Sequence, residues 1–125
     1  MEPRFIGLTP WGRRSTVVEL ELGTGEFFDL FNYSILEKIT WAPQSAQLVL
    51  RISSTSKLRS AKLRLTFGNV DNLEVTAEED AWGSGTIESI AWDVRSSRPW
   101  FRIAISGSNW YFFSQDVRLD VEDNG

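Results

Sequence analysis

The sequence predicts an all-β domain, built as an antiparallel β-sandwich or a flattened barrel of about eight strands. Apolar residues recur with a period of two, which is typical of strands that bury one face. Short segments rich in Gly, Asn, Asp and Ser separate these runs and favour turns. No stretch combines a 3.6-residue period with helix caps. The pattern continues without a linker, so a single domain is expected over residues 1–125.

The N-terminal part contains one alternating strand between two less regular segments. Residues 1–14 show no alternation and are expected to be irregular. Residues 16–22 alternate apolar and polar side chains, and a Gly-Thr-Gly turn at 23–25 ends the run. The aromatic segment that follows has no clean period. A strand and a short helical turn therefore both remain open for residues 27–33.

The middle of the chain predicts four strands. In the first, Ile35, Ile39 and Trp41 are expected to share one side, with Glu37 as the exception. Pro43 ends this run because proline cannot donate a ladder hydrogen bond. The remaining three strands are expected at 47–53, 61–67 and 73–77. The run 61–67 is the clearest half-buried strand, because Leu and Phe alternate there with Lys, Arg and Thr.

The C-terminal part predicts a strand at 86–94 in which Ile87 and Ile90 are out of phase. Such a phase change indicates a β-bulge or a displaced start of the strand. Three further strands are expected at 100–106, 110–114 and 116–122. The tail at 123–125 is expected to be frayed.

The composition argues against most catalytic chemistry. The chain has no histidine and no cysteine, so the usual general base, the commonest transition-metal ligand and a thiolate nucleophile are all missing. The carboxylates fall almost entirely on predicted solvent faces or loops, and no pair stands out as the two acids of a glycosidase. We therefore expect no catalytic residue, no metal site and no cofactor, and predict that the protein is not an enzyme.

Charge and hydropathy narrow the class of partner. The net charge is −4, whereas nucleic-acid binding requires clustered Lys and Arg, so nucleic acid is not an expected partner. An acidic domain attracts a basic protein by long-range steering. No apolar run approaches the ~20 residues that span a bilayer, and no apolar signal segment follows Met1. We expect no membrane partner and a cytoplasmic location.

Six tryptophans are the candidate anchors for binding. Three of them lie within strand patterns and are expected in the core: Trp41, Trp92 and Trp110. The other three lie in or beside predicted loops, where an exposed tryptophan is a favoured interface anchor: Trp11, Trp82 and Trp100. The acidic loop at 78–85 combines such a tryptophan with three acids. The candidate partner-binding patch is therefore Glu78, Glu79, Asp80 and Trp82.

From Phe27 to Val121 the order of elements resembles a family of small, β-rich bacterial immunity proteins of polymorphic-toxin systems. The pieces that carry the resemblance are Phe31-Asn32-Tyr33-Ser34, Leu48-Val49-Leu50, the segments 63–70 and 71–75, and the aromatic segment 110–117. The short polar motif of the family is altered here to Asn32-Tyr33-Ser34, so no site residue is carried over from it. The resemblance implies an inhibitor that binds a toxin directly.

Three functions remain open on the sequence alone. The first is a protein-binding domain that neutralises a basic toxin as an immunity protein. The second is a small-ligand or carbohydrate-binding β module that uses exposed Trp and Tyr as stacking platforms. The third is a structural subunit of a homo-oligomer, in which a second copy covers an unpaired strand edge.

Overall fold

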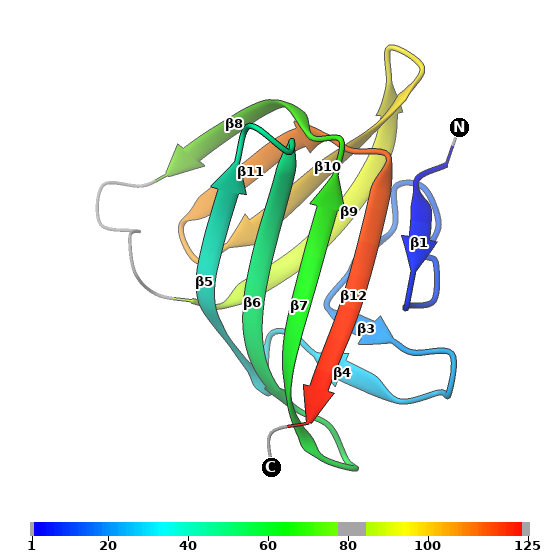
Figure 1. Cartoon of the computed structure of the whole chain (residues 1–125), viewed down its shortest axis with the longest axis vertical. Helices are drawn as coiled ribbons and strands as arrows, with labels where there is room; N and C mark the ends of the chain where they lie inside the picture. The colour runs from blue at the N-terminus through cyan, green and yellow to red at the C-terminus, as the bar shows by residue number, and fades with distance from the viewer. Residues whose placement is uncertain (1, 78–84, 124–125) are drawn as a thin grey trace.

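A computed structural model describes residues 2–77 and 85–123, and all of their regular structure is β (Figure 1). The short helical turn that was open for residues 27–33 does not form. Phe27–Asp29 is a strand, β4, and hydrogen-bonded turns follow it. The candidate patch of Glu78, Glu79, Asp80 and Trp82 lies outside the described residues.

Two five-stranded sheets and one hairpin make up the described fold. Sheet A has the order β1-β12-β7-β6-β5, and its strands are β1 (Arg4–Ile6), β12 (Asp116–Asp123), β7 (Ser60–Gly68), β6 (Gln47–Thr55) and β5 (Ser34–Ala42). Sheet B has the order β2-β9-β10-β11-β8, and its strands are β2 (Thr16–Val17), β9 (Ile87–Arg95), β10 (Arg98–Ile105), β11 (Ser108–Phe113) and β8 (Asp71–Ala77). The hairpin joins β3 (Glu19–Glu21) to β4.

The structure therefore has twelve strands among the described residues, where the sequence predicts about eight. The added strands are short. β1 lies within the N-terminal segment that was expected to be irregular, and the run 16–22 divides into β2 and β3. Strands of two or three residues show too little alternation to be recognised by their period. Both sheets are open, which fits the sandwich alternative and not a closed barrel.

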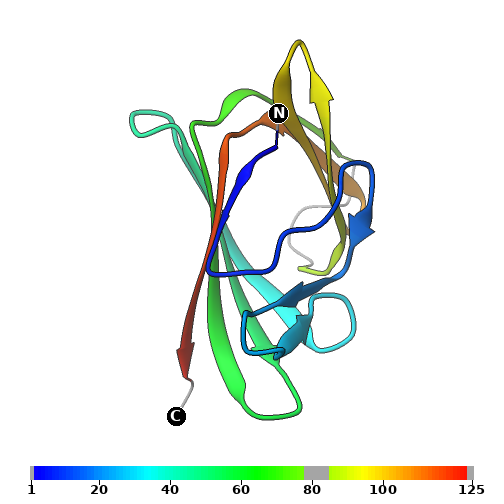
Figure 2. The same cartoon turned by 90° about the vertical axis from the view of Figure 1, so that its right-hand side faces the viewer.

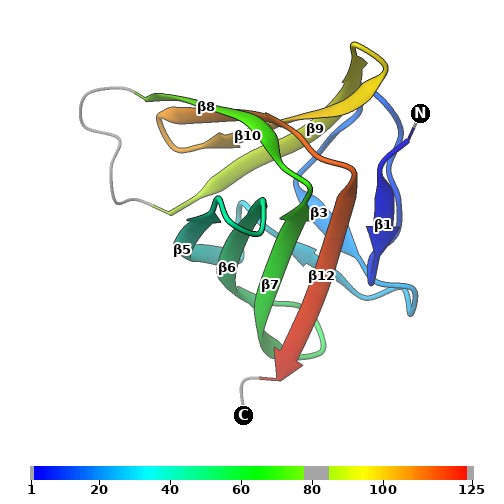
Figure 3. The same ribbon diagram turned by 45° about the horizontal axis from the view of Figure 1, so that its top comes forward.

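The core lies between the two sheets. Figure 2 views the layers from the side, with sheet A on the left, sheet B at the upper right and the β3–β4 hairpin below it. The strands of sheet B run across those of sheet A (Figure 3). Phe67 of sheet A contacts two rings of sheet B, with centroid distances of 5.2 Å to Phe101 and 4.9 Å to Phe112. All three rings are fully buried, so they join the sheets at the centre of the core.

A β-bulge near Ile87 is confirmed. Ser89 pairs with Ala104 and Ile87 pairs with Ile105, so Glu88 is the extra residue of β9. The extra residue brings Ile87 and Ile90 to the same face, and both are buried. The phase change in the sequence thus reflects a real shift in the strand register.

A second bulge, in β5, corrects the expected face of Ile35. Leu36 pairs with Ile52 and Lys38 pairs with Arg51, so Glu37 is the extra residue. As a result Ile35 lies on the opposite face from Ile39 and is 65% exposed, instead of sharing the inner side. The expected face of Ile35 is wrong because it assumes a regular strand, whereas the extra residue Glu37 shifts the side-chain alternation by one position.

Candidate functional site

The β3–β4 hairpin divides its residues into a buried and an exposed face. Leu20 and Phe28 are paired opposite each other and are fully buried against the core. The strand period of two then turns the flanking residues outward: Glu19, Glu21, Phe27 and Asp29. The hairpin is anchored by its apolar pair and presents an acidic and aromatic surface.

The cross-strand pairs on this outer surface are not those that stabilise a sheet best. Glu19 lies directly opposite Asp29, and Glu21 lies opposite Phe27. Like charges directly opposite each other repel across an antiparallel pair, so the Glu19–Asp29 cross-strand contact itself is expected to add no stability. A local arrangement that folding does not favour is typical of a binding surface.

A turn held by Asp29 presents the next aromatic residues. The Asp29 carboxylate accepts hydrogen bonds from the backbone N–H groups of Phe31 and Asn32, each at 2.9 Å, and from the Asn32 side-chain amide at 2.9 Å. Burial alone would raise the pKa of Asp29, but these hydrogen bonds together hold it below its ordinary value. Asp29 is therefore ionised, and the turn leaves Phe31 and Tyr33 largely exposed.

A cavity of about 360 Å³ opens at this surface. It is lined by Glu19, Phe27, Asp29, Tyr33, Thr55, Ser56 and Lys57. Phe27 is 43% exposed and Tyr33 is 65% exposed, so both rings offer free apolar area. We call Glu19, Glu21, Phe27, Asp29 and Tyr33 the hairpin face.

An ion pair beside the cavity fixes the hairpin to sheet A. Arg59 contacts the Glu26 carboxylate at 2.8 Å and also bonds Asp123 at the end of β12. Ser56 donates a further hydrogen bond to Glu26 at 2.8 Å. The hydrogen bonds from Arg59 and then Ser56 lower the pKa of Glu26, whose side chain is only 5% exposed. The hairpin face is therefore held at a fixed position against the loop between β6 and β7.

The tryptophans follow the sequence prediction only in part. Trp92 is buried, and its indole N–H donates to the Trp11 carbonyl at 2.9 Å. Trp11 itself packs against the core and lies 4.8 Å from the Phe5 ring, so it is not a free loop anchor. Trp41 was expected in the core, but it lies on edge strand β5 and is 38% exposed.

Trp100 lies in a stack of side chains on the outer face of sheet B. Its ring is 5.4 Å from that of Tyr111 on β11, and the Arg95 guanidinium of β9 lies 3.6 Å from its centroid. Side chains from both strands that flank β10 therefore pack against the Trp100 ring. A sugar or base would have to displace one of them to stack there, which leaves this face less suited to binding than the hairpin face.

No group of three or more acidic side chains is placed to hold a metal ion among residues 2–77 and 85–123. None of the described residues belongs to a helix that is long and apolar enough to cross a membrane. Comparisons with protein-family models, with curated proteins and with solved structures find no match for this chain.

The hairpin face is not predicted from the sequence, although two signals of it are present. Glu19 and Glu21 flank Leu20, which predicts an acidic outer face on any strand that buries the leucine. Asp29 precedes Phe31 by two residues, which is the spacing of a turn closed by an aspartate side chain. Neither signal could show that a second strand would place Asp29 opposite Glu19.

Proposed function

We propose that the chain is a non-enzymatic protein-binding domain that docks a basic protein on the hairpin face. One observation carries the proposal. Two carboxylates, those of Glu19 and Asp29, and two exposed aromatic rings line a cavity of about 360 Å³, on a hairpin that places these like charges directly opposite each other.

The chemistry of the hairpin face fits a partner that presents Arg or Lys. A cationic side chain entering the cavity would meet the carboxylates of Glu19 and Asp29, and would relieve the repulsion between them. It would also contact the rings of Phe27 and Tyr33, which favour a guanidinium over their faces. The net charge of −4 adds long-range attraction for a basic protein.

The proposed class of partner is a basic toxin, and the proposed role is that of an immunity protein. The support is the resemblance in the order of elements between residues 27 and 121. Neutralising a toxin by binding needs a rigid scaffold and an anchor but no catalytic group. The ion pair of Arg59 and Glu26 supplies such rigidity beneath the hairpin face.

The test begins with capture of partners by the tagged protein from host lysate at low and high salt, followed by mass spectrometry. The captured basic protein is then purified and titrated by calorimetry against single variants. Tyr33→Ala is expected to weaken binding about 30-fold, the loss typical of an interface anchor. Glu19→Lys is expected to weaken binding and to reduce its salt dependence.

The control is Leu58→Ala, because Leu58 is 78% exposed in the neighbouring loop but does not line the cavity. This variant is expected to bind as the unchanged protein does. Equal binding by Tyr33→Ala and Glu19→Lys would overturn the proposed face. A separate variant that reverses the charges of Glu78, Glu79 and Asp80 tests the patch predicted from the sequence.

Two other outcomes would favour the alternatives. Quenching of tryptophan fluorescence by a sugar, with only the bait recovered from lysate, would favour a carbohydrate-binding module. A dimer that persists on dilution would favour a structural homo-oligomer.

A further inference from the structure

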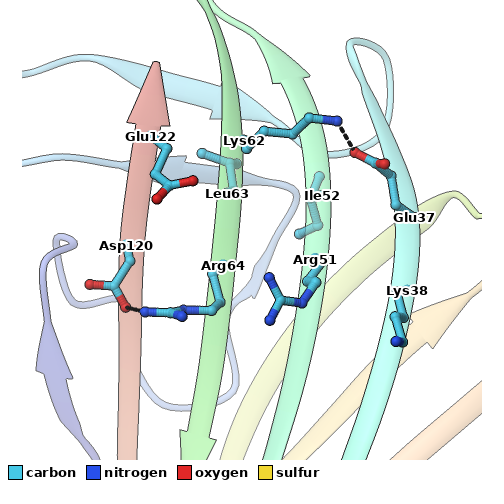
Figure 4. Close-up of a pocket in the computed structure, with 9 residues that line it drawn as sticks. All are labelled: Glu37, Lys38, Arg51, Ile52, Lys62, Leu63, Arg64, Asp120 and Glu122. Carbon is cyan, nitrogen blue, oxygen red and sulfur yellow. Dashed lines mark hydrogen bonds and ion pairs between the residues drawn. The ribbon is translucent and has the colours of Figure 1, made fainter. Parts of the chain in front are cut away.

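Three cations lie side by side on the outer face of sheet A. Lys38 of β5 pairs in register with Arg51 of β6, and Arg51 pairs with Arg64 of β7. The strand neighbours of Arg51 and Arg64 are buried in the core, and all three cationic side chains are exposed to solvent. We call Lys38, Arg51 and Arg64 the cation row (Figure 4).

The β5 bulge creates the cation row. In a regular strand the residue after Leu36 would oppose Arg51, and Lys38 would oppose Leu50 on the core side. The extra residue Glu37 shifts the register and turns Lys38 outward. Bulges commonly re-aim side chains next to functional sites, and this one aligns a third cation with two others.

The acids of the same face leave the centre of the row uncompensated. Figure 4 shows Lys62 reaching to Glu37 on β5 and Arg64 reaching the other way to Asp120 on β12. The two contacts measure 2.5 Å and 3.4 Å, and Asp120 is shared with Arg118 at 3.3 Å. Within the described part of the chain, no carboxylate lies at ion-pair distance from Lys38 or Arg51.

Folding gains nothing from this arrangement. Like charges on directly opposed strands are destabilising, and here both neighbours of Arg51 carry the same sign as Arg51. The row also lines a cavity of about 450 Å³, which lies in the range of small-molecule sites. The uncompensated charge is thus concentrated where a small anion has room to bind.

We propose that the cation row binds the phosphate group of a soluble phosphorylated small molecule. The Arg51 guanidinium is suited to two parallel hydrogen bonds to phosphate oxygens, and Lys38 adds a second uncompensated charge beside it, whereas Arg64 is paired with Asp120. A phosphate carries close to two negative charges at neutral pH and so matches the two uncompensated cations better than a single carboxylate does. Glu122, which also lines the cavity, lies on β12 beside Lys62 rather than beside Arg51.

The surroundings favour a small ligand over an extended polyanion. The chain has a net charge of −4, and acids on β12 border the row. A nucleic-acid strand would extend past the row into these acids and would be repelled. A compact phosphorylated molecule can remain within the cavity, close to Arg51.

Inorganic pyrophosphate is the probe for this site. It is titrated into ¹⁵N-labelled protein at constant ionic strength, and amide shifts are followed by NMR. Saturable shifts are expected in β5, β6 and β7 around the cation row. Arg51→Gln is expected to weaken binding about tenfold or more, as loss of a charged hydrogen bond does. Arg102→Gln is the control, because Arg102 projects from sheet B on the other side of the molecule.

Thermal unfolding without the probe separates a ligand site from a structural role. Arg51→Gln is expected to melt at the same temperature as the unchanged protein or higher, because it relieves repulsion along the row. Pyrophosphate is expected to raise the melting temperature of the unchanged protein and of Arg102→Gln more than that of Arg51→Gln. Absence of saturable shifts at millimolar pyrophosphate, or equal affinity of Arg51→Gln, would overturn the proposal. So would cosedimentation with phosphatidate vesicles without binding of soluble pyrophosphate.

Discussion

At the scale of single residues, Asp93 joins the N-terminal loop to sheet B. Its carboxylate accepts hydrogen bonds from Arg13 at 2.5 Å, from the Val94 backbone N–H at 2.7 Å and from Arg14 at 3.2 Å. The hydrogen bond from Arg13, with smaller contributions from the other two, lowers the pKa of Asp93 from 3.8 to about 2. The ionised form of the Asp93 side chain is therefore more stable in the folded state than in the unfolded state.

Asp93→Asn tests this linkage. A lowered carboxyl pKa stabilises the fold above the unfolded value and loses that contribution as the pH falls through the folded value. We expect the variant to be less stable than the unchanged protein at neutral pH. The difference should shrink as the pH falls from 3.8 towards 2. Urea unfolding at a series of pH values measures it.

Asp71→Asn is the matched control for that experiment. It removes an ion pair to Arg98, but its side chain is 57% exposed where that of Asp93 is 32% exposed. Exposed pairs contribute little, so the control should change the free energy of unfolding by less than about 1 kcal/mol. If the difference in the free energy of unfolding between Asp93→Asn and the unchanged protein did not change with pH, the lowered pKa of Asp93 would be contradicted.

At the scale of elements, the β9–β10 hairpin is closed by two residues in a left-handed conformation. Ser96 and Ser97 have φ values of 51° and 60°, and Arg95 pairs with Arg98 around them. Two consecutive positive φ values in a two-residue loop define a type I′ turn, which matches the twist of the strands. Serine is not the residue that this turn prefers, since an L side chain is strained there.

Ser97→Gly is expected to stabilise the protein by about 0.5 to 1 kcal/mol, because glycine adopts positive φ without steric cost. Ser60→Gly, in strand β7, is the control and is expected to destabilise by about 0.5 to 1 kcal/mol. Urea midpoints of the two variants should therefore move in opposite directions. A lower midpoint for Ser97→Gly would refute the strain at this turn.

The sequence predicts most of the strands but not which residues of neighbouring strands lie opposite each other. Strands with one buried face repeat every two residues, which is why the longer strands and the bulge at Glu88 could be predicted. The bulge at Glu37 produced no clear phase change, because Ile35 is apolar although it faces solvent. The cation row and the Glu19–Asp29 pair depend on which residues of separate strands lie opposite each other, and alternation along one strand shows only which face a residue occupies.

One edge of sheet A shows how local sequence fails to specify a long-range contact. The backbone N–H of Leu36 donates to the carbonyl of Gly85 at 2.7 Å, so a residue two positions before β9 covers part of the β5 edge. A Cβ at position 85 would overlap with the Leu36 carbonyl oxygen. Only glycine lets the backbone at position 85 approach Leu36 so closely, yet the sequence around Gly85 predicts no more than a loop.

At the scale of the whole molecule, the contact between sheets depends on few large rings. Phe67→Ala would leave a cavity beside Phe101 and Phe112, and is expected to cost about 3–5 kcal/mol in the free energy of unfolding. Phe31→Ala is the control, because Phe31 is half exposed, and is expected to stay within about 0.5 kcal/mol of the unchanged protein. Urea unfolding measures both, and equal costs would contradict the position of Phe67 at the centre of the core.

The pairing of β1 with β12 has a consequence for how the molecule is made. The strands are parallel, and Arg4 meets Asp116 at 2.9 Å across 112 positions of chain. On the ribosome, β1 emerges well before β12, so this edge of sheet A cannot close until β12 has been synthesised. Contacts between such distant segments also slow folding, because the intervening chain must first be ordered. The segment around β1 therefore has no partner strand in the nascent chain, and we expect it to dock only after β12 is available.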